Sequence, residues 1–425
     1  MNNTAETNED KFRRQAVSVE AAQARVMPFI VPSGTEQVKL AESMGRILAE
    51  DVVAPHPYPF FRRSGMDGYA VKSSDTEYCH AEEPVLLQVV DNIPCGSLPS
   101  VPIVPGTAAR IMTGAKVPDE ADAVVMLEMT EQEIQDGRTY IKLKRPISSG
   151  LNITPVGFEI SAEDRLLEKG RKLSAGEISV LATFGLASVP VMKRPRVAVL
   201  STGSELLEVD EPLQDGKIRN SNTYMLASQI IEAGGEPHLL EAIPDQLDKA
   251  RRIIEQALTD YDIVITTGGV SVGDYDIMAD LVKGPDVEML FNKVTMRPGS
   301  VTTAAVKNGK LLFALSGNPG ACFVGFELFV RPLLGGMLGR EKPFLAEICA
   351  ELGSDYMKIN NFTRFVRGRL DLSSGKVIAY PALLDESSVM VTIKDSDVLI
   401  VIPPTTTGVQ AGQRVKVLKL PGGGW

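Results

Sequence analysis

The residues of this chain whose types could do chemistry gather in short polar turns that follow apolar runs. The stretch from Asp262 to Asp276, DIVITTGGVSVGDYD, opens with an apolar run typical of a strand buried on both faces of a parallel sheet. Its glycines allow backbone N–H groups to approach a phosphate or other oxyanion closely. The carboxylates of Asp274 and Asp276 can hold a hard cation such as Mg²⁺. The stretch predicts a site for an anionic ligand and a metal, although a tight turn with solvated acids is the simpler interpretation.

Two further turns have the same character. STGSE, which contains Glu205, follows an apolar strand that begins at Arg196, and LSGNPGA overlaps the end of a strand predicted over residues 310–317. In an open parallel sheet the ligand crevice lies outside the carboxyl ends of the strands. All three turns place glycine beside serine, threonine or asparagine at a strand exit. Their agreement therefore favours a ligand site over ordinary turns.

Alternating strands and helices position these turns. Helices are predicted over residues 221–234 and 245–258 and, as a largely apolar run, after Asn318, with strands between them. Strict alternation of this kind predicts a doubly wound, mainly parallel α/β sheet, which we place at residues 194–340.

The flanking regions show other patterns. Residues 17–53 are predicted to be helical twice, with a break near residues 28–34 and a second helix over residues 40–52. Another helix is predicted at residues 174–184 from its capping-box spacing. Short β-branched runs between Pro84 and Pro146 predict a small β-rich lobe, and similar runs after Lys342 predict a separate β barrel or sandwich.

Asp67 and Thr113 are weaker candidates within the β-rich region. Asp67 lies between Gly65 and Gly68 in a turn that presents one carboxylate, and Thr113 places a hydroxyl beside Gly114 at a strand end. Either could contact a ligand, but such dipeptides are more commonly ordinary turns.

Composition argues against several classes of function. Lys plus Arg number 44 against 54 Asp plus Glu, a net charge of −10, which argues against a large nucleic-acid surface. The N-terminus lacks an apolar signal segment and no run of about 18 apolar residues occurs, so we expect a cytoplasmic protein that enters no membrane. The four cysteines form no CxxC pair and the three histidines are isolated, so neither a zinc site nor a Ser-His-Asp triad is expected. Acid/base work then falls to carboxylates.

Several motifs occur in one order along the chain. They are MDGYAV from Met66, RIMTGA from Arg110, STGSEL from Ser201, TTGGVSVGDYD from Thr266, RPG from Arg297 and SGNP from Ser316. Their order and spacing resemble those of the MoeA-type molybdopterin molybdenumtransferases, a family that includes the E domain of gephyrin. The resemblance extends from about Val17 to the C-terminal β region.

This resemblance implies a chain of four domains. They are a helical linking domain from residues 1–62 and 159–193, an inserted β-rich lobe at 63–158, a molybdopterin-binding α/β domain at 194–340 and a C-terminal β barrel at 341–425. The resemblance also implies a homodimer whose active cleft lies between the α/β domain of one subunit and the inserted lobe of the other. The implied reaction inserts molybdate into adenylylated molybdopterin with Mg²⁺ and releases AMP. A contact with the molybdopterin adenylyltransferase would deliver the substrate.

The family's functional positions can be carried over onto residues of this chain. The catalytic positions fall on Asp67, Thr113, Glu159, Glu205, Asp245 and Asp276, of which Glu205 and Asp276 would hold the metal. The substrate-binding positions fall on Gly268, Gly269, Ser271, Gly273, Asp274, Arg297, Ser300, Ser316, Gly317, Asn318 and Pro319. Clustered carboxylates would hold Mg²⁺ and, through it, orient an oxyanion that they could not bind unaided. The glycine turns would cradle the terminal phosphate of the pterin.

The chain departs from the family's pattern at cationic positions. Thr154 and Ser300 stand where the family usually has arginine and lysine, and Ser316 stands where it has proline. Two lost cations would weaken anion binding unless a nearby arginine compensates, the candidates being Arg62, Arg63 and Arg297. A second hypothesis is therefore a paralogue that binds molybdopterin with weak or no turnover. A third, less favoured hypothesis is a molybdopterin adenylyltransferase, an activity for which the α/β domain alone would suffice.

Overall fold

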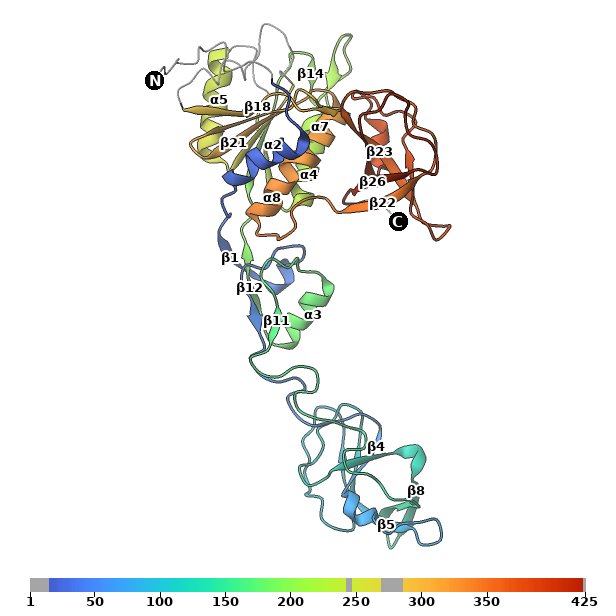
Figure 1. The fold of residues 1–425 in the computed structure, drawn as a ribbon. Coiled ribbons are helices and arrows are strands. Elements are labelled where there is room, and N and C mark those ends of the chain that lie inside the picture. The colour runs from blue at the N-terminus through green and yellow to red at the C-terminus, as the bar shows by residue number, and fades with distance from the viewer. Residues whose placement is uncertain (1–14, 242–246, 269–285, 423–425) are drawn as a thin grey trace, which may run out of the picture. The chain divides into compact units, whose positions relative to one another are not determined.

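A computed structural model describes residues 15–241, 247–268 and 286–422 of the chain (Figure 1). The chain divides into two compact units. The first unit contains Met1–Glu50, Lys169–Ser174 and Ser188–Trp425, and the second contains Asp51–Glu168 and Ala175–Ala187. The boundaries of the four domains predicted from the sequence stay a prediction.

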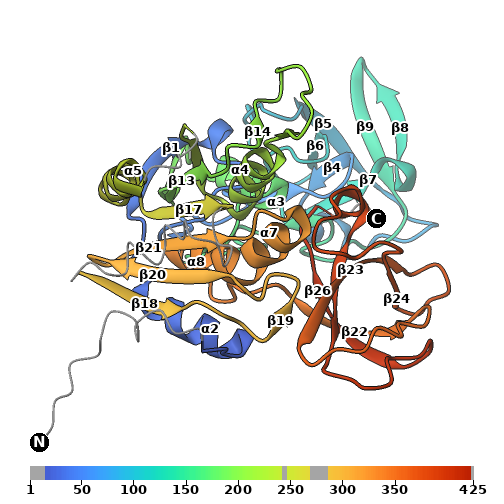
Figure 2. The ribbon, with the colours of Figure 1, turned by 90° about the horizontal axis from the view of Figure 1, so that it is seen from above.

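The first unit contains a six-stranded sheet in the order β16-β13-β17-β21-β20-β18. Figure 2 labels its neighbouring strands β13, β17, β21, β20 and β18. Its strands are β13 (Arg196–Ser201), β16 (Glu236–Leu239), β17 (Ile263–Thr267), β18 (Val287–Phe291), β20 (Thr303–Lys307) and β21 (Lys310–Leu315). Strands β16, β13, β17 and β21 run parallel, as predicted. Strands β20 and β18, which the sequence patterns did not reveal, add an antiparallel edge.

Helices cover both faces of this sheet because its strands are apolar on both sides. They are α4 (Ser221–Ala233), α5 (Leu247–Asp260), α7 (Pro319–Gly325), a π-helical turn over Phe326–Val330 and α8 (Arg331–Met337). Val197 and Val199 share a core with α4, α7 and α8, whereas Ala198 and Leu200, which point the other way, pack against α5. The run Pro319–Met337 has the length and composition of a membrane-spanning helix, but 89% of it is buried, as in a core helix.

The N-terminal segment is less helical than its sequence predicts. The first predicted helix is present as α2 (Val19–Val26), which begins at the N-cap Ser18. The second, over residues 40–52, is wrong. The chain forms β1 (Thr35–Lys39), a 3₁₀ turn over Leu40–Glu42, a turn at residues 44–45 and isolated bridges at Ile47 and Leu48 before β2 (Val52–Val53). Leu48 is fully buried whereas Met44 is 60% exposed, so the apolar positions do not share one helix face. Bridges from Ile47 to Lys172 and from Leu48 to Val191, which lies in β12 (Ser188–Met192), override the local periodicity.

The second unit is built around a six-stranded sheet in the order β7-β4-β6-β5-β9-β8. Its strands are β4 (Gly68–Val71), β5 (Val85–Ile93), β6 (Thr107–Ile111), β7 (Ala123–Met126), β8 (Glu131–Gln135) and β9 (Arg138–Leu143). Short pairs join β3 (Arg63–Ser64) to β10 (Ile153–Thr154) and β2 to β11 (Arg165–Leu167), and the predicted helix is present as α3 (Ala175–Thr183).

The C-terminal strands of the first unit form a closed barrel, which is one of the two folds, barrel or sandwich, predicted for this region. They are β22 (Glu347–Leu352), β23 (Thr363–Asp371), β24 (Ile378–Pro381), β25 (Val398–Ile402) and β26 (Arg414–Lys419). The order β23-β24-β22-β26-β25 closes because β25 also pairs with β23. The short strand β19 (Met296–Arg297) adds a parallel pair to β23 and so joins the α/β region to the barrel.

Candidate functional site

A pocket of about 630 Å³ lies where β13, β17 and β21 end. The three polar turns identified in the sequence all contribute to its walls, and the first turn of α4 adds Asn220, Ser221 and Asn222. Of the residues predicted to bind substrate or metal, the structure brings together Glu205, Gly268, Ser316, Gly317, Asn318 and Pro319. Asp245, Gly269, Ser271, Gly273, Asp274 and Asp276 lie outside the described residues.

Gly268 makes the contact between the turns, and its position requires glycine. Its φ of +90° lies in the left-handed region, and a Cβ there would press on the Thr202 carbonyl and lie 2.8 Å from Thr202 Oγ1. Its N–H donates to the carbonyl of Leu315 at 3.3 Å. A Cβ on Gly317 would lie 3.4 Å from the Gly268 Cα, so the two turns are in direct contact. The backbones of the three turns therefore lie in close contact in the pocket wall, which side chains larger than glycine would prevent.

Gly268→Ala is expected to lower the free energy of unfolding by about 2–3 kcal/mol, because it combines backbone strain with a clash against the Thr202 backbone. Gly309→Ala is the matched control: its φ is +77°, but no atom lies within 4 Å of the added Cβ. We expect the control to lose only about 1 kcal/mol. Urea unfolding followed by circular dichroism distinguishes the two, and equal losses would mean that the Thr202 contact is unimportant.

Asn222 ties two strand exits together, and sequence reasoning missed it. Its Nδ2 donates to Thr267 Oγ1 at 2.9 Å and to the Gly317 carbonyl at 2.8 Å. Its buried Oδ1 accepts no hydrogen bond from the described residues. A second asparagine, Asn220, caps α4 by accepting from the Thr223 N–H. The sequence Asn-Ser-Asn at residues 220–222 could have indicated a helix start with asparagine side chains near it, because asparagine is favoured at N-caps.

Glu205 is the carboxylate that lines this pocket among the described residues. It follows Gly203, whose φ is +138° and whose absent Cβ would lie 2.6 Å from Glu205 Oε1. The pairing of β14 (Leu206–Leu207) with β15 (Ile218–Arg219) fixes the adjoining backbone. Within residues 15–241, 247–268 and 286–422, no group of three or more histidine, cysteine, aspartate or glutamate side chains could hold a metal. The oxygen donors that line the pocket nevertheless suit a hard cation such as Mg²⁺.

The second unit places Asp67 and Thr113 in contact. Asp67 Oδ1 accepts hydrogen bonds from the Thr113 N–H and hydroxyl, both at 2.7 Å. The hydrogen bond from the Thr113 N–H, then that from its hydroxyl, lowers the pKa of Asp67 below its usual value. In the same unit Glu159 forms an ion pair with Arg63 at 2.9 Å. These are two separate pairs, each with one exposed carboxylate.

Thr113→Val is expected to raise the pKa of Asp67 towards the ordinary aspartate value, because the hydroxyl donor is lost while the N–H donor remains. Carboxyl-carbon NMR titration measures this pKa directly. Thr107→Val, which replaces the first threonine of β6 and removes hydrogen bonds with Val104 only, is the control and should leave the pKa of Asp67 unchanged. An unchanged pKa in Thr113→Val would assign the whole effect to the backbone.

The chain is similar along most of its length to named proteins. Its sequence matches the MoeA N-terminal region (domain I and II) at residues 17–185, a probable molybdopterin binding domain at 198–336 and the MoeA C-terminal region (domain IV) at 349–420. The molybdopterin molybdenumtransferase of Bacillus subtilis (strain 168) is 45% identical over 96% of this chain and 94% of its own. The chain belongs to the molybdopterin molybdenumtransferase family.

Further similarity comes from another bacterium and from a solved structure. A molybdopterin molybdenumtransferase of Staphylococcus aureus (strain MRSA252) is 42% identical over 95% of this chain and 94% of its own. The crystal structure of a molybdopterin biosynthesis MoeA protein from Pyrococcus horikoshii has a TM-score of 0.83 at 31% identity, over 97% of this chain and all of that one. The predicted class, a transferase of molybdenum cofactor biosynthesis, is confirmed with the family.

Of the two positions at which the resemblance predicts a cation, Ser300 belongs to the first unit and Thr154 to the second. Ser300 does not line the pocket, although its neighbour Val301 does, and its carbonyl accepts from the Val294 N–H. Thr154 pairs with Arg63 in the β3–β10 ladder. Arg62, one candidate for compensation, instead donates to three backbone carbonyls, those of Ala121, Pro118 and Asp119. Arg62 is therefore occupied in holding its own unit together.

The other two candidate arginines are placed differently. Arg63 forms the ion pair with Glu159 and lies 5.5 Å from the ring centroid of Tyr58. Arg297 is exposed on β19, with its guanidinium 5.9 Å from the ring centroid of Phe362. Among the described residues, Arg297 forms no ion pair with a carboxylate.

Proposed function

We propose that this chain inserts molybdenum from molybdate into adenylylated molybdopterin, with Mg²⁺, and releases AMP. The observation that carries the proposal is the convergence of three polar strand exits and the start of α4 on one pocket. Family membership supplies the reaction class, and the pocket supplies a place for the anionic substrate.

The pocket's own residues explain how an anion would be held and oriented. The first turn of α4 lines the pocket and provides the positive end of the helix dipole, which favours a phosphate. Gly268 and Gly317 allow the backbone to approach the ligand closely. Asn222, which also lines the pocket, is fixed through the two hydrogen bonds that its Nδ2 donates. Binding geometry is thus set before the substrate arrives.

Glu205, with Asp276 from outside the described residues, is proposed to hold Mg²⁺. When bound, the ion would neutralise charge on the phosphate and molybdate oxygens. Asp67, Thr113, Glu159 and Asp245 are proposed to contact the substrate, and the remaining polar turn residues are proposed to bind its phosphate. In this proposal the protein acts as a cytoplasmic homodimer and receives its substrate from the molybdopterin adenylyltransferase.

The direct test mixes purified protein with adenylylated molybdopterin, molybdate and Mg²⁺. We expect release of AMP together with cofactor that reactivates a cofactor-free molybdoenzyme. Asp276→Ala should abolish both products, whereas Asp395→Ala, which removes an exposed carboxylate of the barrel region, should not. Absence of product from the wild-type protein with good substrate would refute the proposal. ATP-dependent adenylylation of free molybdopterin would favour the adenylyltransferase instead.

The replaced cations support a second candidate, a paralogue that binds molybdopterin with weak or no turnover. Ser300 and Thr154 stand at cationic positions of the family, and Arg62 is engaged with backbone carbonyls. Under this alternative, Ser300→Lys should switch on insertion while molybdopterin binding changes little. Full turnover by the wild-type protein would exclude it.

A further inference from the structure

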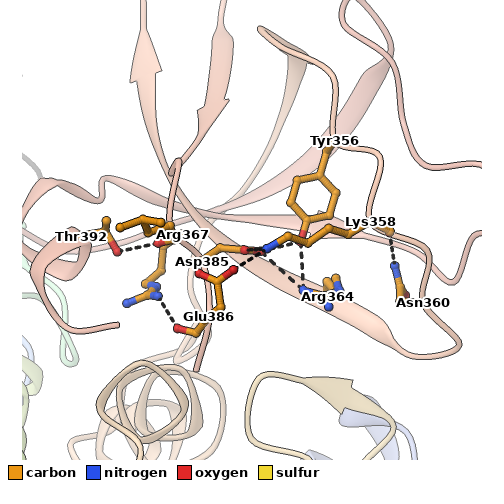
Figure 3. Close-up of polar contacts among 9 residues, drawn as sticks. Tyr356, Lys358, Asn360, Arg364, Arg367, Asp385, Glu386 and Thr392 are labelled. Carbon is orange, nitrogen blue, oxygen red and sulfur yellow. Dashed lines mark hydrogen bonds and ion pairs between the residues drawn. The ribbon is translucent and has the colours of Figure 1, made fainter. Parts of the chain in front are cut away.

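An ionic cluster in the C-terminal barrel surrounds the buried Asp385 (Figure 3). We call Tyr356, Lys358, Arg364 and Asp385 the Asp385 cluster. Asp385 is only 7% exposed and accepts from the Tyr356 hydroxyl at 2.5 Å and from the Lys358 ammonium, and Arg364 lies 3.5 Å away. Arg364 also donates to the Tyr356 hydroxyl at 3.0 Å. One carboxylate therefore organises three side chains from a different segment of the barrel.

The cluster keeps Asp385 ionised. Burial opposes ionisation, but hydrogen bonds from Lys358 and Tyr356 outweigh it and lower the pKa of Asp385. Burial, together with the hydrogen bond to Asp385, raises the pKa of the Tyr356 hydroxyl, so that it remains a donor. Asp385 lies in the barrel loop that follows β24, and the cluster fixes the beginning of its segment Asp385–Val389.

Arg367 fixes the other part of the same loop. Its side chain, 1% exposed, donates to the carbonyl of Glu386 at 3.0 Å and to that of Val389 at 2.5 Å. The two carbonyls bracket Ser387 and Ser388. Such bonds hold a backbone segment in one conformation, because a buried guanidinium that loses its acceptors is costly.

The loop held in this way meets the substrate pocket. The Gly320 N–H donates to the Ser387 carbonyl at 2.9 Å, and Asn318 Nδ2 donates to Ser387 Oγ at 3.2 Å. Ser388 lines the pocket beside Asn318. Gly320 leaves room for this contact, since a Cβ there would lie 3.0 Å from both the Ser387 carbonyl oxygen and Arg367 Nη1.

We propose that the Asp385 cluster consists of positioning residues for the reaction. It holds the loop Asp385–Val389 against the start of α7 and thereby sets the distance between Ser388 and the strand-exit turns. The barrel then contributes a wall of the substrate pocket and does more than support the fold. The link to substrate rests on the proposed function, whereas the coupling between the cluster and the pocket rests on the contacts alone.

Tyr356→Phe and Asp385→Asn test the proposal, the first being the milder change because the ring remains. We expect KM for adenylylated molybdopterin to rise about tenfold with kcat within about twofold, because a displaced wall weakens binding. Amide hydrogen exchange should become faster both in the loop and at Gly320, whose N–H donates to it. Lys376→Met, which removes an exposed barrel cation paired with Glu351, is the control and should change neither measurement.

The two readouts separate the possible failures. Faster exchange confined to the barrel loop, with Gly320 unchanged, would overturn the positioning role whatever the activity. A fall in kcat with KM unchanged would indicate general loss of folded enzyme and would also overturn it. If the wild-type protein has no insertion activity, the proposed function fails, but exchange at Gly320 still decides whether the cluster positions the pocket wall.

Discussion

Asn222→Asp is expected to lower kcat/KM for molybdenum insertion by about 10²- to 10³-fold. The side chain keeps its size, but the new carboxylate cannot donate to Thr267 Oγ1 or to the Gly317 carbonyl. It also places a negative charge in a pocket proposed to receive phosphate and molybdate. Each lost hydrogen bond contributes about 1 kcal/mol or more, and the repulsion adds to this. Steady-state release of AMP at several substrate concentrations measures the effect.

Ser228→Asp is the matched control for this prediction. It adds the same charge to the same helix, α4, at an exposed residue that does not line the strand-exit pocket. We expect the control to retain kcat/KM within about twofold, because exposed charges far from a site are screened. If the two variants lose activity equally, net charge rather than the pocket is responsible. If Asn222→Asp is as active as the wild type, the substrate binds elsewhere.

The strand-exit site could be foreseen because its signal is local. In each turn an apolar run passes directly into glycine and hydroxyl residues, as in the change from Ile265 to Gly268. The parallel order of β13, β17 and β21 then brings the turns to one edge of the sheet. The contact between Asp67 and Thr113 could not be foreseen in this way. Neither the Asp-Gly nor the Thr-Gly dipeptide indicates hydrogen bonds between residues 46 positions apart in the chain.

Structural features that depend on contacts between distant residues could not be predicted from local sequence patterns. The predicted helix over residues 40–52 failed because Leu48 forms a bridge to Val191, a partner invisible to local periodicity. The antiparallel strands β18 and β20 were missed because they carry no turn motif with a chemical meaning. Asp385 sits in an ordinary polar loop, and only the closed barrel brings it to Tyr356.

Arg331→Met is expected to lower the free energy of unfolding of the first unit by about 3–5 kcal/mol. Arg331 and Glu327 form an ion pair with side-chain exposures of 6% and 1%, through two hydrogen bonds at 2.5 and 2.9 Å. Without the guanidinium, the Glu327 carboxylate would keep Gln229 as its remaining side-chain donor among the described residues. A buried charge left with so little compensation is strongly destabilising. Differential scanning calorimetry should show the transition about 10 °C lower.

The double variant Glu327→Met with Arg331→Met separates charge from packing. With both ionic groups replaced by apolar side chains of similar length, we expect most of the stability to return, because no unpaired buried charge remains. Glu232, the second carboxylate near Arg331, is 42% exposed and can turn to water. Lys376→Met at the exposed Lys376–Glu351 pair should cost less than about 1 kcal/mol. If the double variant is as unstable as Arg331→Met, lost packing rather than the unpaired Glu327 carboxylate explains the effect.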